Sequence, residues 1–308
     1  MISRRNIRVK VMQSLYTLST LEPEPKPKEA SRILNQHFDQ TRSLFVYLIY
    51  FLTNVAGYAE KDARLRAAKH LPTAADLKVN TKIAGNEILQ KMLKDPALRE
   101  QFTNEKPELS IDAELVKKIY HTLAEKPEYK TYIIHPERNI NDEKKIIEFI
   151  LDELMLNDET FISHIEENYS NWDDDAELII QLLVAYINKP GSYNFKQMIS
   201  PDKARFAETL LKTVQEKNDY LQSMIIPKLK NWDPERIAHL DMILMKMGVS
   251  EFLFFETIPP KVTINEYIDL AKEYSTQQSG QFVNGILDNI HKELVQQGKM
   301  KKVDFKKA

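Results

Sequence analysis

The chain has no cysteine, and glycine accounts for only 7 of its 308 residues. Without cysteine, disulfides, thiolate metal sites and cysteine nucleophiles are all excluded. With so little glycine, the sequence offers few positions for tight hairpin turns between strands. Leucine, isoleucine, lysine and glutamate instead recur at three- and four-residue spacing throughout the chain, which predicts an all-α fold.

Long apolar segments are missing as well. The longest run, from Leu44 to Val55, is interrupted by Thr53 and Asn54 and is too short to span a bilayer. The first residues, Met1 to Arg5, open an amphipathic stretch without a small-residue cleavage site, so we expect no secretory signal. These features predict a cytoplasmic protein with no membrane partner.

The sites that common enzyme classes need are not visible either. Only Gly280 and Gly285 approach the spacing of a phosphate loop, and apolar residues follow them where lysine and a hydroxyl would be required. The run from Asp173 to Asp175 could bind a cation, but acids are also favoured in the first turn of a helix, and we favour this second interpretation. We therefore expect no catalytic residue, no cofactor and no metal. The histidines lack paired metal spacing and are predicted to be surface or capping residues: His37, His70, His121, His135, His164, His239 and His291.

The small net charge of −2 hides segments of opposite sign. Four cations and no acid occur before residue 22, and five lysines and one aspartate occur in the last ten residues. Between Asn139 and Glu177, thirteen carboxylates oppose two lysines, a local charge near −11. An anionic ligand is therefore expected to approach the ends of the sequence rather than its middle.

Helix signals are strongest near the two ends of the sequence. Ser3 is a possible N-cap for a helix that extends to about Leu21, and a longer helix is predicted from about Lys28 to His70. From Thr73 to Arg138 the pattern is weaker. We expect helices over 82–94 and 112–124 there, with proline-containing connections at Pro96, Pro107 and Pro127.

Two better-marked helical hairpins are predicted over 142–187 and 201–255. The two hairpins resemble each other in sequence at a shift of 60 residues, which aligns Asn171-Trp172-Asp173 with Asn231-Trp232-Asp233. Either a duplication or a chance likeness of two amphipathic hairpins explains this resemblance. Asp233-Pro234-Glu235 predicts a helix start. A capping box from Thr263 to Glu266 predicts the next helix, and a last helix follows over 281–296, before a lysine-rich tail expected to be disordered.

Binding chemistry is suggested near both ends of the chain. Arg4, Arg5, Arg8 and Lys10 lie in the first turns of the first helix, where the helix dipole disfavours cations, so an anionic partner such as RNA is one explanation. An ordinary basic N-terminus is the other. Near the start of the last helix, an exposed Phe282 could stack on a base, with Asn284 and Asp288 nearby. On periodicity alone, Phe282, Ile286 and Ile290 form a core stripe.

Several strings together resemble the NusB family. They are Asn231-Trp232 through Asp241, Lys246 to Glu251, Ile258-Pro259-Pro260-Lys261-Val262-Thr263-Ile264-Asn265-Glu266, Leu270-Ala271-Lys272, and Ser279 with Phe282-Val283-Asn284-Gly285-Ile286-Leu287-Asp288. The N-terminus is similar too, because Arg4, Arg5, Arg8, Gln13, Leu15 and Tyr16 match the family's arginine-rich first helix and its Gln-x-Leu-Tyr ending. The resemblance covers about residues 1–55 and 200–293.

The resemblance implies NusB-like helical bundles with an additional helical insertion. The domains would be N-terminal helices over 1–56, an acidic insertion over 57–199, a C-terminal bundle over 200–293 and a basic tail over 294–308. It also implies a non-enzymatic antitermination adaptor that binds boxA-like single-stranded RNA together with ribosomal protein NusE, in a complex with RNA polymerase that supports ribosomal RNA transcription. Carried over by position, the residues that bind RNA would be Arg4, Arg5, Arg8, Tyr16, Phe282 and Asn284. Asp241 and Lys246 would lie at the RNA and NusE contacts.

Some residues depart from the family pattern. The family often has a glutamate at the position of Val9 and a basic residue at that of Met242. At the position of Gln281 it frequently has lysine or arginine. The loss of two cations should weaken phosphate contact and its salt dependence. The acidic insertion could steer a basic partner, or it could be a solvated outer face. Two alternatives to the adaptor stay open. One is a helical protein-interaction scaffold that has lost RNA binding. The other is the NusB-like accessory domain of RNA cytosine methyltransferases, although no methyl-donor site is visible.

Overall fold

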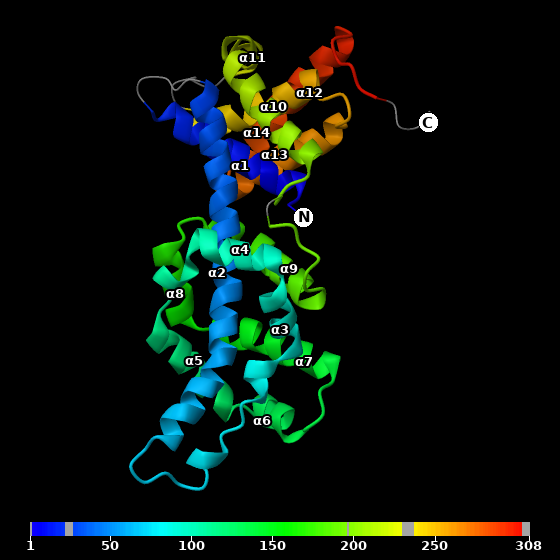
Figure 1. The fold of residues 1–308 in the computed structure, drawn as a ribbon. Coiled ribbons are helices and arrows are strands. Elements are labelled where there is room, and N and C mark those ends of the chain that lie inside the picture. Colours follow the sequence, from blue (N-terminus) through cyan, green and yellow to red (C-terminus); the bar gives the residue numbers. More distant parts are fainter. Residues whose placement is uncertain (1, 22–26, 196, 230–236, 304–308) are drawn as a thin grey trace. The chain divides into compact units, whose positions relative to one another are not determined.

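Figure 1 shows a computed structural model of the chain, which describes residues 2–21, 27–195, 197–229 and 237–303. All regular secondary structure in these ranges is helical, which confirms the predicted all-α fold. None of the helices in the same ranges combines the length and apolar character that a bilayer crossing needs. The predicted helix start at Asp233-Pro234-Glu235 and the Asn231-Trp232-Asp233 string lie outside the described residues.

The chain divides into two compact units, which we call unit 1 and unit 2. Unit 1 combines residues 1–38 with residues 199–308, and unit 2 comprises residues 39–198. Helix α2 (Pro27–Ala67) contributes residues to both units. These units are defined by contacts, whereas the predicted insertion over 57–199 was defined by resemblance. Its boundaries therefore stay a prediction.

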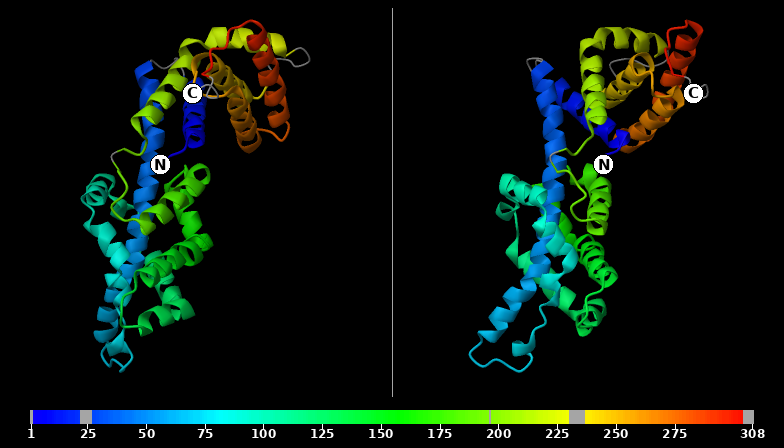
Figure 2. Two further views of the ribbon diagram at one scale, coloured as in Figure 1. Left: turned by 90° about the vertical axis from the view of Figure 1, so that its right-hand side faces the viewer. Right: turned by 45° about the vertical axis from the view of Figure 1, so that its right-hand side comes forward.

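Unit 1 brings the two ends of the sequence into one bundle (Figure 2). Its central helix is α12, which contacts α1, α10, α11, α13 and α14 and buries most of its residues. A helix that is apolar on nearly all sides is stable only inside a bundle. The elements that follow or precede α2 in this unit are α1 (Arg4–Ser19), α10 (Pro201–Glu216), α11 (Asn218–Ile225), a 3-10 turn (Ile226–Lys228), α12 (His239–Phe254), α13 (Pro260–Tyr274) and α14 (Ser279–Gln296).

Three sequence signals in unit 1 can be compared with the structure. Ser3 is the N-cap of α1, and its hydroxyl accepts a hydrogen bond from the backbone N–H of Asn6 over 3.2 Å, as predicted. The predicted capping box at Thr263 is wrong, because α13 already begins at Pro260, where a proline is favoured in a first helical turn. In the described part of the predicted tail, Lys302 Nζ donates to the Phe255 carbonyl over 2.7 Å, and residues 304–308 lie outside the described residues.

Unit 2 is organised around the long helix α2. The residues of its apolar run, Leu44 to Leu52, are buried except for the half-buried Tyr50. Phe45 stacks with Phe195, and Phe51 meets Phe161 edge to face. The other elements are α3 (Glu87–Lys94), α4 (Pro96–Glu105), α5 (Ala113–Glu125), α6 (Pro127–Ile134), α7 (Ile140–Phe149), a π-helical segment (Ile150–Met155), α8 (Glu159–Asn168), α9 (Trp172–Asn188) and 3-10 turns at Asp76–Lys78, Lys82–Gly85 and Pro107–Leu109.

Two helices of unit 2 begin at prolines that the sequence analysis assigned to connections. Pro96 is the first residue of α4, and Pro127 is the first residue of α6. Pro107 likewise opens a 3-10 turn. Proline is well suited to this position, because the N–H that it lacks would have no partner inside the helix. The predicted connections at Pro96 and Pro127 are therefore wrong.

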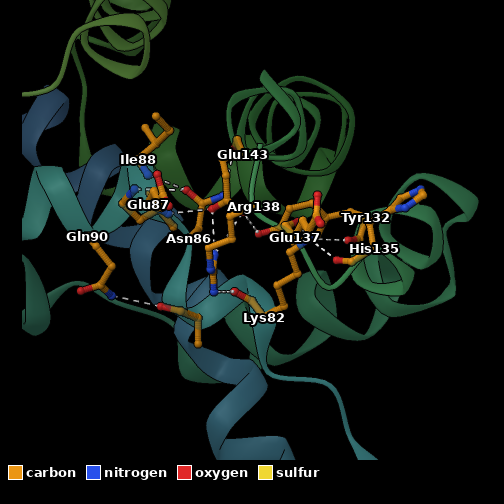
Figure 3. Close-up of polar contacts among 12 residues, drawn as sticks. Lys82, Asn86, Glu87, Ile88, Gln90, Tyr132, His135, Glu137, Arg138 and Glu143 are labelled. Atoms are coloured by element: carbon orange, nitrogen blue, oxygen red, sulfur yellow. Dashed lines mark hydrogen bonds and ion pairs between the residues drawn. The ribbon is translucent and has the colours of Figure 1, made fainter. Parts of the chain in front are cut away.

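A buried carboxylate joins three segments of unit 2 (Figure 3). Glu143, on α7, accepts hydrogen bonds from the Tyr132 hydroxyl over 2.8 Å and from the backbone N–H of Glu87 over 2.7 Å. Arg138 Nη1 lies 3.0 Å from both carboxylate oxygens of Glu143. Asn86 caps α3 and donates to the Glu143 carbonyl over 2.9 Å. These contacts hold α3, the end of α6 and α7 together.

Two further sequence hypotheses concern the acidic region. Asp173, Asp174 and Asp175 occupy the first turn of α9, where the capping interpretation expects them. In the described part of the chain, no group of three or more histidine or acidic residues is arranged to hold a metal ion. The duplication stays a prediction. In the first predicted hairpin the last helix is α9, which begins at Trp172, and in the second it is α12, which begins at His239. These two starts are 67 residues apart, whereas the sequence match is at a shift of 60.

Candidate nucleic-acid interface

Helix α1 presents an exposed face that carries three of the predicted RNA-binding residues. Arg4 is exposed, and its guanidinium carbon lies 5.7 Å from the centre of the Phe206 ring. Arg5 is partly exposed and pairs with Glu273, at the end of α13, over 2.7 Å. Tyr16 has 48% of its surface exposed. A surface ion pair of this kind contributes little to stability, so an incoming phosphate can compete with Glu273 for Arg5.

Arg8 follows Arg4 by one turn of the same helix, but its side chain is directed into the bundle and is buried. Its Nε and Nη2 atoms donate to the two carboxylate oxygens of Glu251 over 2.7 and 3.1 Å, and its Nη1 donates to Glu266 over 3.1 Å. Burial alone would lower the pKa of Arg8, but the hydrogen bonds and charge of Glu251 raise it overall. The Arg8 side chain is only 2% exposed. The expectation that Arg8 contacts RNA directly does not fit this conformation, because its three nitrogens are already bonded inside the bundle.

Glu251 is the centre of this buried cluster. It also accepts hydrogen bonds from the Thr263 hydroxyl and the Tyr267 hydroxyl, each over 2.9 Å. Burial, followed by the charge of Glu251, raises the pKa of Tyr267, which keeps its hydroxyl a donor. The cluster therefore fixes α1 against α12 and α13. This fixed position determines where Arg4, Arg5 and Tyr16 appear on the surface.

A cleft of about 540 Å³ opens beside Tyr16. Its walls come from α1, from His37 on α2, from the start of α12 and from Tyr274 at the end of α13. The ring of Tyr16 meets the ring of His239 edge to face at 5.7 Å, and His239 Nε2 lies 2.6 Å from the Ser19 hydroxyl. Aromatic and polar side chains that line a cleft at an exposed basic helix can accommodate an unpaired base.

The start of α12 is joined to the start of α14 at this end of unit 1. The Ser279 hydroxyl donates to Asp241 Oδ2 over 2.7 Å, and Asp241 is buried. Asp241 Oδ1 is also buried and has no hydrogen-bond partner among the described residues. Phe282 follows Ser279 by one helical turn and is partly exposed, while Asn284 is exposed. Asp241 thus positions the segment that carries Phe282.

Lys246, the second residue predicted to bind a partner, lies further along α12. Its Nζ donates to Asn218 Oδ1 over 2.7 Å, and burial lowers its pKa. It lines a second cavity of about 370 Å³, together with apolar residues of α1, α10 and α12 that include Leu15 and Ile243. The cavity's polar lining residues are Ser19, Gln215, Asn218, His239 and Lys246. A mixed apolar and polar lining with one lysine suits a protein side chain better than a phosphate backbone.

Comparison with known proteins assigns the family. Proteins named transcription antitermination protein NusB are similar to this chain: 36% identical over 126 residues in Methylacidiphilum infernorum, which covers 38% of this chain and 87% of the relative. For the Salinibacter ruber protein the identity is 38% over 132 residues, covering 42% and 76%. The chain belongs to the NusB family. A Nitratiruptor protein with the same name is 38% identical over 125 residues, covering 38% of this chain and 89% of the relative.

The NusB family model matches residues 159–292. This range contains Asp241, Lys246, Phe282 and Asn284, but it excludes α1 and therefore Tyr16 and the arginines. It also includes α8 and α9, which the sequence analysis assigned to the insertion. No solved structure matched the chain. Membership of the NusB family supports a role in transcription antitermination, while the individual contact residues stay predictions.

Sequence reasoning missed several residues that shape this face of the NusB bundle. Glu251 and Glu273 partner the arginines of α1 from positions more than 240 residues away. His239 and His37 line the cleft beside Tyr16, although both were grouped with ordinary surface histidines. His239 and Glu251 carried a local signal, because both lie in strings that resemble the family.

Proposed function

We propose that this NusB family member is an RNA-binding antitermination adaptor. It would bind boxA-type single-stranded RNA together with ribosomal protein NusE, and support ribosomal RNA transcription in a complex with RNA polymerase. One observation supports the proposal most. Arg5 and Tyr16 reach the surface of α1, where Arg5 contacts the end of α13 and Tyr16 contacts the start of α12. The start of α14 belongs to the same unit. The activity is binding rather than catalysis.

The proposed roles of the individual residues follow from their positions on α1 and α14. Arg4 and Arg5 would contact phosphates, since a guanidinium can hold phosphate oxygens bidentately. Tyr16 and Phe282 would stack on bases, and Asn284 would donate or accept hydrogen bonds at a base edge. Arg8 would act as a positioning residue that holds α1 in place through Glu251.

The partner side of the proposal concerns the second cavity. Lys246 would meet NusE at the partly apolar cavity next to α1, where an acidic or carbonyl group of the partner could replace Asn218 as its acceptor. Asp241 is buried, so we assign it a supporting role through Ser279 rather than a direct contact.

A titration with boxA RNA tests the proposal. A fluorescein-labelled boxA-type RNA and a scrambled RNA of the same composition are each titrated with the full chain, with and without NusE, at two salt concentrations. We expect tighter binding of boxA than of the scrambled RNA, and a further increase in affinity with NusE. Equal binding of both RNAs would reject specific recognition. If neither RNA binds but NusE does, the chain is a protein-interaction scaffold.

A further inference from the structure

The end of α2 and the loop that follows it form an exposed, leucine-bearing end of unit 2. We call residues 61–78 the tip. Leu65, Leu71 and Leu77 have 55%, 84% and 61% of their surfaces exposed. The loop is folded around Asp76, which accepts hydrogen bonds from the backbone N–H of Thr73 over 3.0 Å and from its hydroxyl over 2.8 Å. Three exposed leucines, one in the last turn of α2 and two in the structured loop that follows it, indicate an interaction surface.

The charge that the tip presents to solvent is positive. Both of its acids are buried and paired within the tip, one with Arg66 over 2.8 Å and the other with Lys69 over 2.7 Å. Three exposed cations pair with no acid among the described residues: Lys61, Arg64 and Lys78. The tip contains no phenylalanine, tyrosine or tryptophan on which a base could stack, and its one ring is that of His70. Its surface therefore favours an apolar pocket with acidic groups over an RNA strand.

Such a pocket lies at the same end of unit 2, between α6 and α7. It has a volume of about 560 Å³, with Tyr132, Ile146 and Phe149 among its lining residues and Glu128 and Asp142 as its two acids. Lys145 and His135 also line it. Beside the pocket, Ile134 is 73% exposed. An exposed isoleucine next to a partly apolar pocket extends the surface that a partner could cover.

Three hydrogen bonds fix the pocket close to the tip. Asn80, two residues after the end of the tip, donates to the Ile133 carbonyl of α6 over 3.2 Å. Lys82 Nζ donates to the carbonyls of Tyr132 and His135 over 2.9 and 2.6 Å (Figure 3). The tip and the pocket of one molecule therefore lie side by side. A two-fold axis can then bring each tip to the pocket of the other copy, because a two-fold interface is self-complementary.

We propose that a second copy of this chain docks at this end, so that the leucine-bearing tip of each copy occupies the α6–α7 pocket of the other. Leu71 is the central residue of the contact, and the cations of the tip face Glu128 and Asp142 of the other copy. Two small, partly charged contacts form a weak and salt-sensitive interface, so the dimer forms reversibly at micromolar concentrations. The inference does not depend on RNA binding by unit 1.

Sedimentation velocity of the full chain over a concentration series, at low and high salt, tests the dimer. Two variants each remove one side of the contact: Leu71→Asp in the tip and Thr131→Arg, an exposed pocket-lining position. Each alone raises the dissociation constant about a hundredfold or more, because both copies of the contact are lost at roughly tenfold each. An equimolar mixture of the two variants associates again, because an intact tip meets an intact pocket once per heterodimer.

Leu109→Asp is the matched control, since Leu109 is 80% exposed elsewhere in unit 2, and it dimerises as the unmodified chain does. Leu71→Ser repeats the tip result with a smaller change, and unaltered far-ultraviolet circular dichroism verifies the fold of each variant. The proposal is overturned if the unmodified chain stays monomeric throughout the series. It is also overturned if Thr131→Arg dimerises normally, which indicates tip-to-tip contact, or if the mixture fails to associate. If the unmodified chain stays monomeric but binds duplex or single-stranded RNA, and the Leu71 variants lose that binding, the tip is a nucleic-acid surface instead.

Discussion

Arg8 Nε donates to Glu251 Oε1 over 2.7 Å, although the two residues are 243 positions apart and both are buried. The arginines at the start of the sequence therefore have two different environments within one helix, the protein surface and the buried core. Arg4 is exposed and Arg5 is partly exposed, whereas Arg8, one helical turn after Arg4, is buried in the bundle. The hydrogen bonds of Arg8 with Glu251 and Glu266 fix the position of α1, and therefore that of its exposed side chains.

Replacement of Arg8 should therefore affect folding before it affects RNA contact. We expect Arg8→Met to lower the free energy of unfolding by about 3–5 kcal/mol, because Glu251 is left as an uncompensated buried charge. Arg8→Lys should recover only part of this loss, since an ammonium cannot reproduce the bidentate pairing. Urea denaturation measures both. Arg4→Met, at an exposed position of the same helix, should change the free energy by less than about 1 kcal/mol, and equal losses for Arg4 and Arg8 would contradict this role.

Much of the helical architecture could be predicted from local signals. Ser3, Asn86 and Asp112 cap helices as their residue types favour, and the apolar run of α2 is buried as its composition requires. The starts of α4 and α6 were missed for a local reason too. Proline is common both in connections and in first helical turns. Asp95 before Pro96 was an N-cap signal that could have decided for a helix start, whereas Lys126 before Pro127 offered none.

The site was less predictable because it depends on long-range pairing. Four arginine and lysine residues in α1 look equivalent in the sequence, and only the position of Glu251 separates the buried Arg8 from Arg4 and Arg5. Similarly, Thr263 fits a capping box, but it lies inside α13 and donates to Glu251. No periodicity reports which helix faces which other helix, so contacts between distant segments require the structure.

Two glycines of the C-terminal bundle should respond to alanine in opposite directions. A Cβ at Gly248 would lie 2.9 Å from Leu287 Cδ2 and 3.3 Å from Tyr267 Cδ2, where α12, α13 and α14 meet. A Cβ at Gly285 would meet nothing within 4 Å. We expect Gly285→Ala to stabilise by about 0.5–1 kcal/mol through helix propensity. Gly248→Ala should destabilise, because overpacking typically costs about 1–3 kcal/mol. Thermal unfolding of the two variants compares them, and stabilisation by both would contradict the close packing at Gly248.

Asp76 should make the tip sensitive to acid. The hydrogen bond from Lys69, followed by that from the Thr73 backbone, lowers the pKa of Asp76 from 3.8 to about 2. A depressed pKa in the folded state contributes stability above pH 4, and this contribution is lost as the pH falls toward 2. A carboxyl carbon NMR titration should find a midpoint near 2 for Asp76. In Lys69→Met the midpoint should rise toward 3.8, and an unchanged midpoint would mean that Lys69 does not hold the carboxylate.

The central claim is that the exposed face of α1 binds RNA, and Tyr16 offers the sharpest comparison. Tyr16 and Tyr220 belong to the same unit and are 48% and 47% exposed, but only Tyr16 borders the cleft beside the basic helix. Removal of either ring should leave folding intact at such exposed positions.

The decisive measurement is the affinity of Tyr16→Leu and Tyr220→Leu for boxA-type RNA, by fluorescence anisotropy at one fixed salt concentration in the presence of NusE. We expect Tyr16→Leu to weaken binding about 5- to 100-fold, which is the range for loss of one base–aromatic stack, and Tyr220→Leu to bind as the unmodified chain does. Equal affinities of the two variants would contradict the assignment of α1 as the RNA-binding surface.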